Sequence, residues 1–69
     1  MPLNFAEKGK EHLIRKVGGS AEVKSHLEDL GFVAGGTVSV VSAVGDNLIV
    51  NVKGSRIAIS AELAQKIMI

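Results

Sequence analysis

The stretch TVSVVSAVGDNLIVNVKGSRIAIS, residues 37–60, contains three apolar runs separated by short glycine-containing turns. Within these runs valine, leucine or isoleucine alternates with other residues, a period of two that is typical of β-strands with one buried face. The alternation predicts strands over residues 37–44 and 48–53, and a third strand that contains Ile57 and Ile59. We therefore expect an antiparallel three-strand meander.

The two turns of this meander decide which residues face each other. Gly54-Ser55 has the composition of a two-residue type II′ loop, which would place Lys53 directly opposite Arg56. Such a pair of like charges is mildly unfavourable and hints at an acidic partner, but simple solvation of an exposed tip explains it better. For the earlier turn we expect a three-residue loop over residues 45–47, because a two-residue loop over residues 45–46 would turn the valine face outward.

A helix is predicted immediately before the meander, over residues 21–30. Ser20 is a suitable N-cap, and apolar residues recur behind it at helical spacing. Gly31 then falls at the position where a helix ends in a left-handed conformation, and Phe32 falls where it can contact Leu27 in a Schellman motif. The glycine and the phenylalanine are thus explained by helix termination before any ligand is considered.

The flanking segments extend the pattern on both sides. Residues 10–17 read as a first strand with a bend or bulge, preceded by an arm whose Leu3 and Phe5 are expected to pack on the body. Ser60 is the expected cap of a short helical turn over residues 61–65, and the closing KIMI suits a last strand. This order predicts a mainly β protein, a small, partly open SH3-like β-barrel of about five strands that forms one domain over residues 1–69.

The composition narrows the classes of function. Of the 69 residues 46% are hydrophobic, none is cysteine, and the net charge is +1, which argues against disorder, disulfides and a basic nucleic-acid surface. There is no signal-peptide pattern and no apolar run near the roughly 20 residues of a membrane span, so we expect a cytoplasmic protein that is not membrane-embedded. No nucleophile or acid–base pair stands in a catalytic context, which predicts a non-enzyme.

Two groups of residues remain as candidate ligand sites. Residues 31–37 match part of a phosphate-binding loop, but the lysine is missing and a helix stands where a strand should, so turning of the chain explains them better. Glu22, His26 and Asp29 share one face of the predicted helix and could hold a divalent transition metal weakly. Favourable spacing of opposite charges on a solvated helix explains this trio better, because it needs no ligand, so we expect no dedicated metal site or cofactor.

Several segments, taken in order, resemble the FeoA family of small proteins. They are the N-terminal MPL, Gly9, the Gly18-Gly19 turn, LEDLGFVAGGTVSVV over residues 27–41, VKGSRIAI in the hairpin, and the closing ELAQKIMI. The resemblance covers nearly the whole chain. It implies an SH3-like barrel with a helix between the first two strands, a fold also found at the C-terminus of iron-dependent repressors.

The resemblance also implies a role in bacterial ferrous iron uptake, as a cytosolic accessory or regulatory partner of the iron permease FeoB. Its expected contact surface is the corner Leu30, Phe32 and Val33, with the hairpin residues Lys53 and Arg56 as a second choice. If Phe32 is used as the helix cap, Leu30 and Val33 are the better contacts. The sequence leaves the oligomeric state undecided, because an unpaired barrel edge can pair with a second copy of the chain.

Two alternative functions come from other classes. One is a small transition-metal sensor or carrier based on Glu22, His26 and Asp29. The other is an RNA-binding SH3-like barrel, which the scattered charge and the lack of stacking aromatic residues disfavour.

Overall fold

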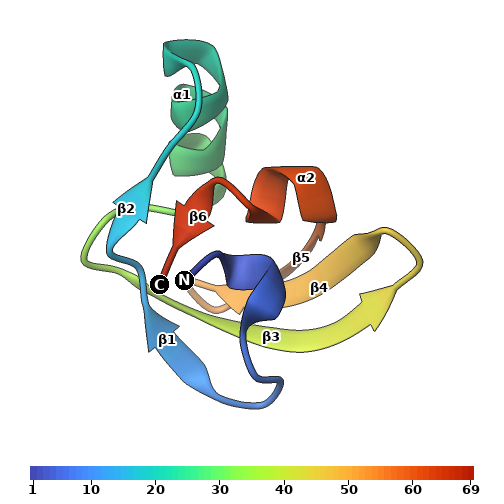
Figure 1. Cartoon of the computed structure of the whole chain (residues 1–69). Coiled ribbons are helices and arrows are strands. Elements are labelled where there is room, and N and C mark those ends of the chain that lie inside the picture. The colour runs from blue at the N-terminus through green and yellow to red at the C-terminus, as the bar shows by residue number, and fades with distance from the viewer.

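The computed structural model describes all of residues 1–69 and shows a small β-barrel built from two sheets (Figure 1). One sheet has the strand order β1-β3-β4-β5 and the other pairs β2 with β6. In chain order, the elements are η1 (Leu3–Phe5), β1 (Glu11–Leu13), β2 (Lys16–Val17), α1 (Ala21–Leu30), β3 (Thr37–Val44), β4 (Asn47–Val52), β5 (Ser55–Ser60), α2 (Ala61–Ala64) and β6 (Ile67–Met68). The predicted order of strand, helix, meander, helical turn and strand is confirmed.

The bend or bulge predicted within residues 10–17 is the point where the chain leaves one sheet and enters the other. β1 pairs with β3, and β2 pairs with β6, so the chain passes from one sheet to the other between them. Ile14 stands at this crossing and is fully buried. Its amide N–H donates to the carbonyl of Gly36 over 2.8 Å, and its own carbonyl accepts from the amide of Gly35 over 2.8 Å. These bonds satisfy the backbone where neither sheet pairs it.

The predicted three-residue loop between β3 and β4 is wrong. Val44 lies opposite Asn47, so the loop has two residues, and Ala43 lies opposite Leu48. The register shifts between Val40 and Ser42, which leaves Val41 as the extra residue of a β-bulge. The extra residue turns the side chains of residues 42–44 to the opposite face of the sheet from the one that regular alternation predicts. Val38 and Val40, which precede the bulge, therefore stay in the core although the loop has only two residues. Val44 is consequently 61% exposed.

The predicted position of the second turn is also wrong, by one residue. The loop consists of Lys53 and Gly54, whose φ angles of 50° and 77° give a type I′ geometry. Arg56 therefore lies opposite Asn51 and not opposite Lys53. A type I′ turn matches the right-handed twist of the strands it joins, which favours it although Lys53 must take a left-handed conformation.

The left-handed conformation of Lys53 predicts a stabilising substitution. Asn tolerates positive φ better than Lys, so Lys53→Asn is expected to raise the free energy of unfolding by about 1 kcal/mol. Urea denaturation followed by circular dichroism measures this change. Lys66→Asn, at an exposed position for which no positive φ is found, is the control and is expected to bring no gain. An unchanged midpoint for Lys53→Asn would show that the turn is not strained.

Both predicted ends of α1 are confirmed. Ser20 Oγ accepts a hydrogen bond from the amide of Val23 over 3.3 Å. At the other end Gly31 has a φ of 111°, and the amide of Phe32 donates to the carbonyl of Leu27 over 3.0 Å, the long bond of the Schellman motif. Leu27 and Phe32 are both fully buried, which fastens the end of the helix to the core.

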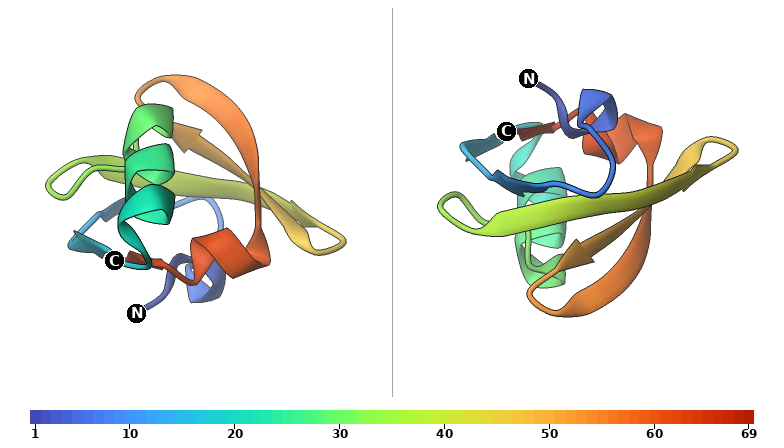
Figure 2. Two further views of the ribbon diagram at one scale, coloured as in Figure 1. Left: turned by 90° about the horizontal axis from the view of Figure 1, so that it is seen from above. Right: turned by 90° about the horizontal axis from the view of Figure 1, so that it is seen from below.

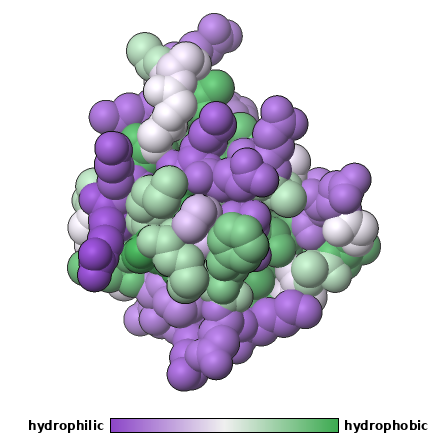
Figure 3. Space-filling view, viewed as in Figure 1, coloured by the Kyte–Doolittle hydropathy of each residue, from purple (hydrophilic) through white to green (hydrophobic).

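The N-terminal arm packs on the barrel through Leu3 but not through Phe5. Leu3 is fully buried, whereas Phe5 is 68% exposed, so the prediction that both would pack inward is wrong. Residues two apart on a 3₁₀ turn of three residues point in different directions, and only one of them can face the core. Figure 2 shows η1 lying against the barrel beside α2, and Figure 3 shows an apolar group on this face.

One apolar core takes members from every element except β1. Its members are Leu3, Ile14, Val17, Leu27, Phe32, Val38, Val40, Leu48, Val50, Val52, Ile59, Ala64 and Ile67. No polar or charged residue is buried. Neither helix has the length and apolar character needed to cross a membrane.

Candidate functional site

The two predicted contact regions lie next to each other in the structure. Gly31, at the end of α1, approaches the β4–β5 hairpin so closely that an added Cβ would stand 3.5 Å from Lys53 Cδ and 3.5 Å from Val52 Cγ2. The helix corner and the hairpin tip therefore form one continuous surface. We call it the corner surface, and define it by Leu30, Val33 and Lys53. Arg56, the other predicted hairpin residue, lies opposite Asn51 and therefore faces the side of the sheet away from Val52 and the helix corner.

Exposure divides the predicted contact residues into two kinds. Phe32 is fully buried, so it supports the corner from within and offers nothing to a partner. Leu30 and Val33 are half-buried, and Lys53 and Arg56 are exposed. The corner surface thus presents two apolar side chains beside one cation, Lys53, whereas Arg56 is exposed on the other face of the hairpin. Neither cation forms a salt bridge, because the single salt bridge of the structure joins Lys10 to Glu7.

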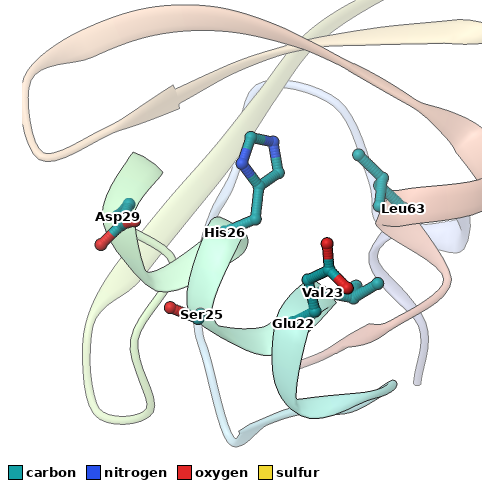
Figure 4. Close-up of a pocket in the computed structure, with 6 residues that line it drawn as sticks. All are labelled: Glu22, Val23, Ser25, His26, Asp29 and Leu63. Atoms are coloured by element: carbon teal, nitrogen blue, oxygen red, sulfur yellow. The ribbon is translucent and has the colours of Figure 1, made fainter.

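A second feature is an open pocket between α1 and α2, with a volume of about 510 Å³. Its lining consists of Glu22, Val23, Ser25, His26, Asp29 and Leu63 (Figure 4). The α1 members recur at three- and four-residue spacing and so share one side of the helix. Leu63 comes from α2 and meets them only because the chain folds back.

The three candidate metal ligands line this pocket but do not form a metal site. Figure 4 shows the His26 ring between the other two side chains, with the carboxylates of Glu22 and Asp29 on opposite sides of it. No group of three or more histidine, cysteine, aspartate or glutamate side chains in the structure could hold a metal ion. Helical spacing correctly places the three residues on one face, but it does not bring their ligand atoms to one point.

Sequence reasoning did not find the apolar part of this pocket. Val23 and Leu63 are half-buried and pack against the core. Each reads in the sequence as an ordinary core residue of its own helix. Only the position of α2 beside α1 shows that part of each side chain is left to line a pocket (Figure 4).

The whole chain, residues 1–69, matches the family model of the FeoA domain. The chain belongs to the FeoA family. It is 34% identical over 68 residues to a protein of Methanocaldococcus jannaschii named as an Fe(2+) transport protein A, with 99% of this chain and 83% of that protein covered. The family resemblance expected from the sequence is thereby confirmed, and with it the link to ferrous iron transport.

Solved FeoA structures have the same fold. The crystal structure of an iron uptake regulatory protein, FeoA, is 26% identical and superposes with a TM-score of 0.90, covering 99% of this chain and 92% of that one. The zinc complex of Stenotrophomonas maltophilia FeoA is 24% identical, with a TM-score of 0.85 and coverage of 99% and 87%. That protein is described as a prokaryotic SH3 domain protein and suggested as a ferrous iron transport activating factor. The likeness confirms the predicted SH3-like barrel.

Proposed function

We propose that this FeoA-family chain is a non-enzymatic accessory protein of ferrous iron uptake that acts in the cytosol as an interaction module for the permease FeoB. The observation that carries the proposal is the membership of the whole chain in a family named for Fe(2+) transport. The corner surface supports it, because it joins apolar side chains to the unpaired cation of Lys53 on one face of a small barrel.

The chemistry of the corner surface favours an acidic partner surface with an apolar centre. Leu30 and Val33 supply apolar area that is already partly fixed by the Schellman end of α1, so little side-chain freedom is lost on binding. Lys53 stands at the hairpin tip, where it can attract carboxylates and orient the partner. Arg56, just beyond the tip on the other face of the hairpin, stays the second candidate cation. Arginine is among the residues that most often dominate the affinity of interfaces.

Val33→Glu tests this surface. The new carboxylate places a charge at the apolar contact, next to the acidic groups that we expect on the partner. We expect the affinity for the cytosolic domain of the cognate FeoB to fall at least about tenfold, or 1.4 kcal/mol. An amide-resolved NMR titration of the labelled protein measures the affinity and shows which residues shift.

The matched control is Val44→Glu, which introduces the same charge at a 61% exposed valine in another hairpin. It is expected to bind FeoB like the parent chain. Unchanged affinity in Val33→Glu, with shifts elsewhere, would show that the corner surface is not the contact. A titration with ferrous iron alone under anaerobic conditions forms a second arm. Shifts centred on His26 in that arm, abolished by His26→Ala, would favour the metal sensor or carrier over the interaction module.

A further inference from the structure

The face that carries the two chain ends exposes an apolar patch. Phe5, one of only two aromatic residues in the chain, is 68% exposed, and Met1 is 58% exposed. In Figure 3 apolar side chains gather at the centre of this face and hydrophilic ones surround them. A contiguous exposed apolar patch with a polar rim marks a site of protein or membrane interaction.

Backbone pairing brings the residues of the patch close together. The amide of Phe5 donates to the carbonyl of Pro2 over 3.1 Å, Pro2 forms a bridge with Met68, and Met68 pairs with Lys16. Residues directly opposite in an antiparallel pair have their side chains on the same face, so Pro2, Met68 and Lys16 stand in a row. The neighbouring pair, Val17 and Ile67, is buried, so this row faces outward. We call Met1, Pro2, Phe5 and Met68 the N-terminal patch.

Residues 1–17 and α1 carry net charges of opposite sign. Residues 1–17 contain four cationic and two acidic side chains, a net charge of +2, whereas α1 contains one lysine and three acids, a net charge of −2. One of the four cations, Lys10, is paired with Glu7 at 2.7 Å. Lys8, Arg15 and Lys16 are exposed and unpaired, and α1 rises next to β2 at one side of the face that carries the chain ends (Figure 1).

We propose that the N-terminal patch docks on an anionic membrane surface, with Phe5 entering the headgroup region and Lys16 and its neighbouring cations contacting the lipid phosphates. An apolar centre with a basic rim is the arrangement that binds such surfaces. The one pocket of the structure lies on α1, so the patch offers no cavity for the anchor residue of a protein partner. The inference does not rest on the proposed function, because it needs no FeoB.

The chain contains no tryptophan or tyrosine, which allows a direct test. Phe5→Trp introduces a single fluorophore at the patch, and Val44→Trp introduces one at a 61% exposed position on the β3–β4 hairpin. The probes are vesicles of phosphatidylcholine alone and of phosphatidylcholine with about a third of phosphatidylglycerol. We expect the Phe5→Trp emission to shift to the blue with the anionic vesicles only, and to return at high salt, since salt screens the contact. Val44→Trp is expected to stay unchanged.

Co-sedimentation of the unaltered chain with the same vesicles gives an independent measurement. The double variant Phe5→Ser/Lys16→Glu is expected to lower the bound fraction at least about fivefold, whereas Val44→Ser/Lys24→Glu changes the same residue classes elsewhere and is expected to bind normally. Absence of binding by the unaltered chain, or equal binding by both double variants, would overturn the proposal. A blue shift of Phe5→Trp that grows with protein concentration without vesicles would also overturn it, in favour of self-association through the patch.

Discussion

Phe32→Ala is expected to lower the free energy of unfolding by about 3–5 kcal/mol, the usual cost of removing a fully buried phenylalanine. The side chain is 0% exposed and packs where the end of α1 meets the barrel, and its amide makes the long Schellman bond. Domains of this kind are stable by only about 5–15 kcal/mol, and a chain of 69 residues has a thin core. A large unfolded fraction at moderate urea concentration is the expected result, measured by circular dichroism.

Phe32→Leu is the matched control, because it keeps most of the apolar volume and is expected to cost clearly less than Phe32→Ala. A free energy of unfolding within about 1 kcal/mol of the parent value for Phe32→Ala would contradict the core position. The prediction also bears on the corner surface. Loss of partner binding in a Phe32 variant would follow from loss of structure, so Val33→Glu is the variant that tests contact.

Leu3→Ala is expected to cost about 2–5 kcal/mol, although it lies in an N-terminal arm. Leu3 is 0% exposed, and the arm is tied at its start, where the ammonium of Met1 donates to the carbonyl of Ile69 over 2.9 Å and the amide of Ile69 donates back to Met1 over 2.8 Å. In a domain of this size 1 kcal/mol shifts the melting temperature by roughly 4–8 °C. We therefore expect Leu3→Ala to melt at least about 8 °C lower than the parent chain.

Phe5→Ala provides the control for the arm, since it removes a larger side chain two residues away that is 68% exposed. Its melting temperature is expected to stay close to that of the parent, because exposed substitutions usually change stability by less than about 0.5 kcal/mol. Equal losses in the two variants would mean that the arm packs through both residues. A lower melting temperature in Phe5→Ala alone would show that Phe5, and not Leu3, packs in the core.

The candidate sites were only partly predictable. Spacing along one helix was enough to place Glu22, His26 and Asp29 on one face, because helical periodicity is a local property. The joining of the helix corner to Lys53 depends on the close approach of Gly31 to a hairpin more than twenty residues away in the sequence. The pocket between α1 and α2 likewise depends on where the second helix docks. No sequence pattern within either helix indicates how close to each other the two helices pack.

The sequence by itself determined the elements whose causes are local. The ends of α1 follow from a serine cap and from Gly31, because hydrogen bonding and φ preference act within a few residues. The bounds of β3 and the burial of the alternating residues in β4 follow from side-chain period in the same way.

Tertiary structure alone decided the features that depend on distant segments. The bulge at Val41, the shift of the second turn to Lys53 and the passage of the first strand between two sheets each follow from which strands pair, and in what register. Burial of the valines did not select the longer loop between β3 and β4, because the bulge at Val41 keeps Val38 and Val40 in the core with the two-residue loop, the commonest hairpin connection. Leu3 and Phe5 show the same principle, because the core has room for only one of them.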